Sequence, residues 1–228
     1  MTPVAKGDPP PLAVGVTGDR IGAVTPAARA VHKVILRGFA TTGQAPDHAQ
    51  LAIEALAGHD LRDLLRELHD RDVVRLDEQG NIGATYPFSA RPTAHSVSIA
   101  DGPTVWAMCA IDALGIAGLL DRDVIIDSAD PGSGEPVRVI VRAGQAEVDP
   151  EPAVVVSAAD TTACCPPDSP GECVMPAAVR CCGLINFFTS TGSAQAWLAT
   201  YPQASGVILT TDQALRRGID IFGHLLDD

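Results

Sequence analysis

The stretch VWAMCAIDALGIAG, residues 105–118, constrains the fold more than any other part of the chain. It predicts a helix over residues 101–120 that is apolar on nearly every side, and such a helix is buried. A buried carboxylate is costly unless it is paired or useful. Asp112 interrupts this stretch three residues after Cys109, and that spacing places the two on one face of a helix. The stretch therefore predicts either a surface aspartate beside a buried thiol or a thiol and carboxylate that work together.

Length and charge exclude several classes of protein. The 228 residues suffice for one large domain or two small ones with a core, and the net charge is −12. A nucleic-acid-binding protein usually shows a basic face, so nucleic acid is not an expected partner. No apolar run reaches the roughly 18 residues of a membrane helix, and no membrane association is expected. The N-terminal sequence lacks a signal-peptide pattern, so we expect a cytoplasmic protein with reduced cysteines.

The order of predicted elements indicates an α+β protein with two parts. Residues 1–24 are rich in Pro and Gly and predict a flexible N-terminal arm. Residues 25–95 predict three helices and then a hairpin, an N-terminal winged-helix-like module. Residues 96–228 predict the catalytic domain, a mixed or antiparallel β-sheet flanked by helices. Strands are expected at HSVSIAD, RDVIIDSA, EPVRVIVRAG, PAVVVSAA, RCCGLINFFTS and GVILTT, and helices at 193–200 and 212–226.

The winged-helix order does not by itself predict DNA binding. The helix in the recognition position, residues 60–71, carries almost equal numbers of basic and acidic side chains: Arg62, Arg66 and Arg71 against Asp60, Asp63, Glu67 and Asp70. That balance would not favour a phosphate backbone. We therefore interpret residues 25–95 as a structural or interaction module.

The cysteines are unevenly distributed. Cys109 stands alone, whereas the other five crowd together at Cys164, Cys165, Cys173, Cys181 and Cys182. In a reducing compartment such crowding suggests metal, redox or catalytic use, and paired thiolates bind soft metals best. Adjacent residues of a strand point to opposite faces, so at most one of Cys181 and Cys182 should face Cys109. The first three of the five lie in a Pro-rich loop that could relay metal, bind another metal, form a disulfide or be passive.

Four stretches together resemble one known family. They are YPFSARPTAHSVSI, VWAMCAIDALGIAGLLDRDVIIDS, CCGLINFFTSTGSAQAWLATYP and the terminal GHLL. They are similar to organomercurial lyase (alkylmercury lyase) over roughly residues 25–228. The resemblance implies a cofactor-free enzyme that cleaves a carbon–mercury bond with two cysteines and one aspartate. Cys109 and Asp112 match the first pair, and counting back from the Phe-Phe pair without a gap gives Cys182, whereas a shift of one gives Cys181.

The family chemistry implies a role for each of these residues. Cys109 and Cys182 would bind the mercury of an organomercurial substrate, and Asp112 would take a thiol proton and deliver it to carbon. Hg(II) would stay bound as product until small cellular thiols or a mercuric reductase remove it. The flanking Val105, Trp106, Ile111 and Leu114 suggest a dry pocket that would raise the pKa of the aspartate. The chain departs from the family at Met108, in place of a tryptophan, and at Asp130, in place of a further cysteine.

Two other functions compete with the lyase. One is a thiol-rich protein that binds or transfers soft metal without catalysis on the same fold. It needs only sulfur, so the presence of Asp112 favours the enzyme. The other is a winged-helix metal sensor, against which the acidic helix at residues 60–71 argues. The histidines form no metal-binding spacing, and His95 is interpreted as a packing or surface residue.

Overall fold

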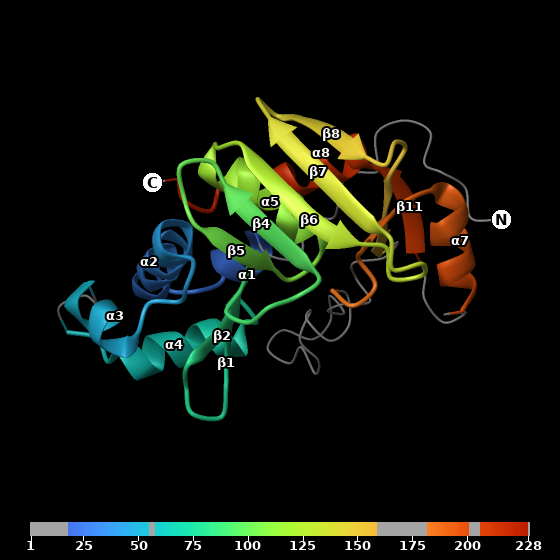
Figure 1. The fold of residues 1–228 in the computed structure, drawn as a ribbon. Coiled ribbons are helices and arrows are strands. Elements are labelled where there is room, and N and C mark those ends of the chain that lie inside the picture. Colours follow the sequence, from blue (N-terminus) through green and yellow to red (C-terminus); the bar gives the residue numbers. More distant parts are fainter. Residues whose placement is uncertain (1–17, 55–57, 159–181, 201–205, 228) are drawn as a thin grey trace.

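The computed structural model describes residues 18–54, 58–158, 182–200 and 206–227, which form antiparallel sheets with helices packed against them (Figure 1). Its helices are α1 (Gly18–Gly22), α2 (Pro26–Thr42), α3 (His48–Glu54), α4 (Leu61–Asp70), α5 (Ala110–Leu120), α7 (Thr191–Ala199) and α8 (Thr211–Phe222). Its strands are β1 (Val74–Leu76), β2 (Ile82–Thr85), β3 (Phe88–Ser89), β4 (His95–Ile99), β5 (Thr104–Ala107), β6 (Val124–Ala129), β7 (Pro136–Arg142), β8 (Gln145–Asp149), β9 (Val154–Ala158), β10 (Phe187–Phe188) and β11 (Gly206–Thr210). The predicted combination of helices and an antiparallel sheet is confirmed. No helix in the described ranges has the length and apolar character needed to cross a membrane.

Two sheets organise the described residues. The larger has eight strands in the order β1-β2-β3-β5-β4-β6-β7-β8, and the smaller has three in the order β10-β9-β11. Every pairing between neighbouring strands in both sheets is antiparallel. The short β10 pairs with β9, so the segment after residue 182 is joined to the smaller sheet.

Helix α5 lies inside the molecule, between the large sheet and α8 (Figure 1). It is buried along almost its whole length, as an all-apolar helix should be. Two glycines allow α5 and α8 to approach closely. A Cβ at Gly218 would lie 2.9 Å from the Ile111 carbonyl oxygen, and one at Gly115 would lie 2.3 Å from the Phe222 ring. Side chains at these positions would separate the helices, so glycine lets α8 seal α5 from water.

The N-terminal helices form where their capping residues predict. Thr25 caps α2 with Pro26 as the first helical residue, and Gly43 ends that helix with φ 78°. Asp60 caps α4 by accepting a hydrogen bond from the Arg62 amide. The three helices α2–α4 and the β1–β2 hairpin have the order expected of a winged helix, but β1 and β2 are the first two strands of the large sheet. The winged-helix assignment and the boundary at residue 95 stay predictions.

Part of the predicted flexible arm has regular structure. Residues 18–22 form α1, and Ile21 and Val24 are buried in the core. Arg20 forms an ion pair of 2.7 Å with the buried carboxylate of Asp72, which fixes α1 against the turn after α4. Residues 1–17 lie outside the described residues.

Two element predictions were wrong. The helix expected over residues 101–120 begins at Ala110, because the β-branched and aromatic residues before it form β5 between β3 and β4. In the described part of RCCGLINFFTS, from residue 182 on, the expected strand is limited to Phe187–Phe188, because residues 182–184 form a turn that includes Gly183. Strand β8 was missed, since its sequence QAEVD is too polar to read as a strand.

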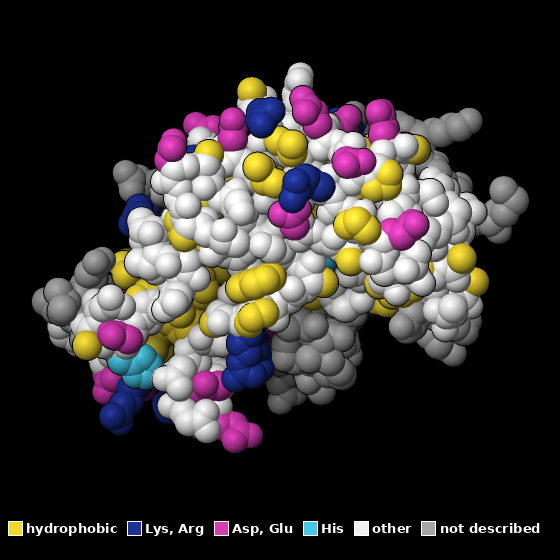
Figure 2. Space-filling model, viewed as in Figure 1, with side chains coloured by type: hydrophobic (Ala, Val, Ile, Leu, Met, Phe, Trp, Pro, Cys, Tyr) yellow, Lys and Arg dark blue, Asp and Glu magenta, His cyan; other side chains and the backbone are white. Residues whose placement is uncertain are grey.

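The outer face of the large sheet mixes charged and apolar side chains (Figure 2). Along β6 and β7 buried residues alternate with outward-facing ones. On the outer side, Arg138 donates to Asp127 at 2.7 Å, and Ile125 is 37% exposed. This sheet therefore carries the core, with α5 and α8, on its inner face.

Candidate active site

Cys109 lies at the junction between β5 and α5. It caps the helix rather than sitting within it: its backbone is extended, and its Sγ accepts a hydrogen bond of 3.4 Å from the Asp112 amide. Ser and Thr usually occupy this position, and the thiol takes the same role. The expected pairing of Cys109 with Asp112 on one helix face is therefore replaced by a cap, which still brings the two residues together.

Asp112 lies in the first turn of α5 and is 5% exposed. Its Oδ2 is buried and has no hydrogen-bond partner within the described residues. Burial raises the pKa of Asp112 to about 7, although a hydrogen bond with Cys109 acts in the opposite direction. The carboxyl group can therefore hold or release a proton near neutral pH.

Cys182 reaches α5 from a turn between residues 182 and 186. Its carbonyl oxygen accepts from the Ile185 amide at 3.3 Å, and the Ile185 carbonyl accepts from the Ala110 amide at 3.1 Å. The turn is thus bonded to the first residue of α5. Cys182 is 9% exposed, against 2% for Cys109, so the slight opening to solvent is on its side. Cys181, Cys164, Cys165 and Cys173 lie outside the described residues.

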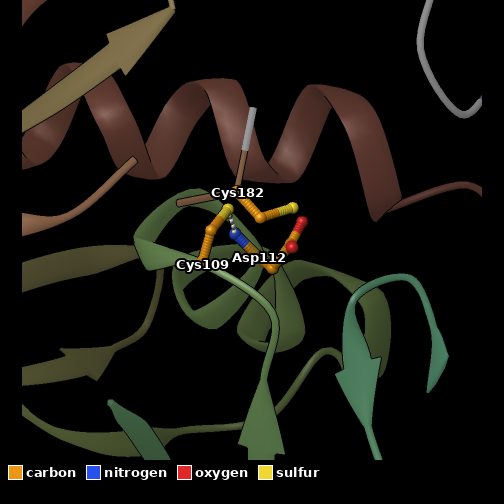
Figure 3. Close-up of side chains that lie close together, drawn as sticks. All are labelled: Cys109, Asp112 and Cys182. Atoms are coloured by element: carbon orange, nitrogen blue, oxygen red, sulfur yellow. Dashed lines mark hydrogen bonds between the residues drawn. The ribbon is translucent and has the colours of Figure 1, made fainter. Parts of the chain in front are cut away.

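The structure brings the three predicted site residues into one cluster. The two sulfurs and a carboxylate oxygen of Asp112 all lie within 4.8 Å of one another. In Figure 3 the Cys182 sulfur points toward the Asp112 carboxylate, while the Cys109 sulfur lies over the Asp112 amide. Both cysteines are free thiols. Burial raises the pKa of Cys109 well above its ordinary value, and contacts with Cys182 and Asp112 add to the effect. A thiol pair with a carboxyl group can bind a soft cation and move a proton beside it.

Three of the four residues expected to surround the site are buried in the core, and the fourth is not. Val105, Ile111 and Leu114 are buried in the same hydrophobic core as Cys109 and Cys182. Trp106 lies on the other face of β5, where it is half-buried beside the loop after α2, because successive residues of a strand point to opposite sides. Met108 is half-buried and packs against the core, with its amide donating to the Pro87 carbonyl.

Asp130, which stands at a family cysteine position, is a buried hydrogen-bond acceptor. Its carboxylate accepts from the Thr189 amide and hydroxyl at 3.0 Å, from the Ser193 hydroxyl at 2.6 Å, and from the amides of Gly132 and Ser133. Burial alone would raise the pKa of Asp130, but the hydrogen bonds from Ser193, Thr189 and Gly132 together bring it below the ordinary value. It joins the turn after β6 to the start of α7.

His95 is buried, as one of the two expectations for it allowed, and it lies close to the turn that carries Cys182. Its ring contacts Phe187 edge-on and interacts with the Asn186 side chain. Burial lowers the pKa of His95 to about 4, with the Asn186 interaction opposing this, so the ring is neutral at physiological pH. Sequence reasoning did not consider Asn186. The signal available was one polar residue between Ile185 and Phe187 in an apolar segment.

Comparisons with known proteins identify relatives of this chain and a structure of similar fold. A family model described as alkylmercury lyase matches residues 88–223. The chain is 33% identical to the alkylmercury lyase of Staphylococcus epidermidis over 168 residues, which are 73% of this chain and 70% of that protein. It is 29% identical to the alkylmercury lyase of Bacillus cereus, over 71% of this chain and 67% of that one. Its fold is similar to a crystal structure described as the mercury-bound form of MerB2, with a TM-score of 0.74, 23% identity, and coverage of 94% and 98% of the two chains.

The fold and these relatives define an enzyme class, the lyases that cleave carbon–mercury bonds. This chain belongs to the alkylmercury lyase family. The resemblance inferred from the four sequence stretches is thereby confirmed, and with it the expectation of an enzyme acting on an organomercurial.

Proposed function

We propose that Cys109, Asp112 and Cys182 are the catalytic residues of this lyase and that they cleave the carbon–mercury bond by protonolysis. One observation supports this most strongly. A buried carboxyl group with an unpartnered oxygen and a pKa of about 7 lies within 4.8 Å of two free thiols. An unpaired buried carboxylate destabilises the fold, so its position beside the thiols points to a chemical role.

The two sulfurs are suited to hold mercury between them. An organomercurial cation is soft, and thiolates are its natural ligands. Two thiolates on opposite sides of one ion stand apart by about twice the metal–sulfur bond, which is about 2.3 Å even for zinc. The sulfur–sulfur separation in this site does not exceed 4.8 Å. Cys109 and Cys182 therefore lie at a spacing that lets both bind one mercury atom.

The proton follows a short route. The Cys109 thiol, with its raised pKa, keeps its proton until mercury binds, and the Asp112 carboxylate then accepts it. Asp112 delivers that proton to the carbon attached to mercury, the carbon–mercury bond breaks, and a hydrocarbon leaves. Mercury stays as Hg(II) on two thiolates, and the second thiol proton is released to solvent. One carboxyl group thus acts first as base and then as acid, for which a pKa near neutrality is suited.

The surroundings of the site suggest how product leaves. The proposed protonolysis needs no cofactor. The slight exposure of Cys182 gives small thiols a sulfur to approach first. We propose that such thiols, or a mercuric reductase, remove the Hg(II). We also propose a cytoplasmic location, because Cys109 and Cys182 are unpaired thiols, the state that a reducing compartment maintains.

Hydrocarbon release from a simple organomercurial with excess thiol tests the proposal. Cys109→Ser and Cys182→Ser should abolish turnover. Asp112→Asn, which keeps the shape but carries no exchangeable acid, should lower it by about 10²–10⁴-fold while the protein still binds mercury. Cys181→Ser is the matched control, and it should turn over like the wild type.

Two results would reject this assignment. If Cys181→Ser rather than Cys182→Ser abolished turnover, the second thiol would be the neighbouring cysteine. If the wild type bound mercury and released no hydrocarbon, the chain would be a soft-metal-binding protein on the lyase fold.

A further inference from the structure

Among the residues that the structure describes, the turn that carries Cys182 makes few backbone hydrogen bonds. Ile185 is bonded to Cys182 and to Ala110, and the Asn186 carbonyl accepts from the Val156 amide at 3.0 Å. Strand β10, which follows, pairs with β9 over only two residues. By contrast, Cys109 is held by the cap of α5 and by strand β5 before it. Side-chain contacts from the described residues therefore contribute to the position of the second sulfur.

Asn186 supplies such contacts. Its Nδ2 donates to the Gly183 carbonyl at 3.0 Å, a bond that closes the turn beside Cys182. Its side chain also interacts with the imidazole of His95. The other side of that imidazole is held as well, because Nδ1 lies 2.9 Å from the Ser128 Oγ. A neutral ring with its proton on Nε2 fits these contacts, because Nδ1 can then accept from Ser128, Nε2 keeps a proton for the Asn186 side chain, and the Asn186 Nδ2 donates to the Gly183 carbonyl.

His95 also borders the strand that leads to Cys109. It begins β4 and pairs with Ala107 of β5, two residues before Cys109. Thr93, just before it, donates from its hydroxyl to the Ala107 carbonyl at 2.7 Å. The ring packs edge-on against Phe187, with a centroid distance of 5.9 Å. One buried residue thus contacts both segments that deliver a site sulfur.

We propose that His95 is a positioning residue for the lyase reaction: with Asn186 it holds the turn so that the Cys182 sulfur stays within reach of a mercury atom bound to Cys109. The inference rests on the proposed function, since it assumes that both sulfurs bind one mercury. The proposed role of His95 involves no contact with the two sulfurs or with Asp112. It acts through Asn186 and the turn, which sets the separation between the two thiols.

Retention of inorganic Hg(II) tests the proposal without requiring turnover. Hg(II) is loaded onto the protein, an excess of a competing dithiol is added, and the mercury that remains on the protein is measured over time after gel filtration. Asn186→Ala and His95→Phe should lose Hg(II) at least tenfold faster than the wild type, approaching the rate of Cys182→Ser. His95→Gln, which keeps a donor and an acceptor, should recover much of the retention. Thermal unfolding should stay cooperative in all of them.

The matched control is Thr189→Val. It removes a hydrogen bond to Asp130 on the other side of β10 and leaves the turn untouched, so Hg(II) retention should equal that of the wild type. If Thr189→Val and Asn186→Ala lost Hg(II) equally fast, the loss would reflect a general decrease in stability, and the proposal would be overturned. Wild-type retention in Asn186→Ala and His95→Phe would overturn it as well. If His95→Phe does not fold, the Hg(II) retention of Asn186→Ala and His95→Gln is the deciding measurement. Asn186 is only half-buried, so its replacement by Ala should leave the fold intact.

The Cys182→Ser variant separates the two proposals. If it retains Hg(II) as the wild type does, Cys182 is no ligand, and both the proposed site and the role of His95 fail. If it loses Hg(II) rapidly while Asn186→Ala and His95→Phe do not, the site stands and only the positioning role fails.

Discussion

Two buried aspartates in this protein have opposite surroundings. Asp112, at the start of α5, has an oxygen without a partner, and burial raises its pKa to about 7. Asp130, after β6, is fully buried and accepts hydrogen bonds from Thr189, Ser193 and nearby amides, which hold its pKa below the ordinary value despite burial. The same side chain is thus kept ready to exchange a proton in one place and permanently charged in the other.

The difference lies in how many donors the fold provides. A carboxylate that receives several hydrogen bonds is stabilised in its charged form and serves as a structural link. One that receives few, in an apolar pocket, is destabilised when charged, and only a function would keep it there. The contrast supports the proposed role of Asp112 in proton transfer, whereas Asp130 links the turn after β6 to α7.

The largest expected effect is a gain of stability in Asp112→Asn. A raised pKa makes the folded protein less stable as pH rises from the ordinary value of 3.8 to about 7, because the unfolded chain ionises first. The difference in unfolding free energy between the variant and the wild type at pH 4 serves as the reference. By pH 8 this difference should shift in favour of the variant by up to about 4 kcal/mol. Urea unfolding across this range measures it, and a pH-independent difference would contradict the raised pKa.

Asp130→Ala should have an effect of opposite sign, a loss of about 3 kcal/mol at neutral pH. It leaves the Thr189 amide and the Ser193 hydroxyl without their acceptor in a buried place. Because the folded-state pKa is lowered, the contribution of the charge is complete above the ordinary value of 3.8 and is lost as pH falls below it. Urea unfolding at pH 7 should show the full loss, and one below 0.5 kcal/mol would show that Asp130 is not a structural joint.

Gly115→Ala should weaken the exclusion of water from Asp112. The added Cβ would lie 2.3 Å from the Phe222 ring and 3.0 Å from the Gly218 carbonyl oxygen, so α8 must shift, at a cost of about 1–3 kcal/mol. As water enters, the pKa of Asp112 should fall from about 7 toward 3.8. Thermal unfolding and the pH dependence of stability measure both effects. Gly22→Ala is the control, since a Cβ there meets nothing within 4 Å, and equal losses in the two variants would refute the packing argument.

Thr189→Val should give the smallest effect, a loss of about 1 kcal/mol. It removes one of the hydrogen bonds to Asp130 and keeps the backbone amide bond of the same residue. Denaturant unfolding at pH 7 measures it. A loss as large as that of Asp130→Ala would mean that the hydroxyl alone, rather than the full set of donors, holds Asp130.

Local rules predicted much of the fold but misplaced the element at the centre of the site. The caps Thr25 and Asp60 and the stop at Gly43 were readable because capping depends on neighbouring residues alone. The start of α5 was placed too early, because the apolar residues 105–107 are compatible with either a strand or a helix. Their pairing with β4 and β3 decides between the two. The turn at Cys182 was read as a strand for the same reason.

By itself the sequence determined which groups are present and how two of them are spaced: Cys109 and Asp112, three residues apart, inside a segment too apolar to lie at the surface. It also supported the family resemblance that singled out Cys182. Only the tertiary structure decided that Cys182 lies beside that pair and that His95 contacts the turn. It also decided that, among the described residues, one oxygen of Asp112 has no hydrogen-bond partner whereas Asp130 accepts several hydrogen bonds. Burial and proton affinity depend on groups distant in the sequence, and packing alone sets which of those groups meet.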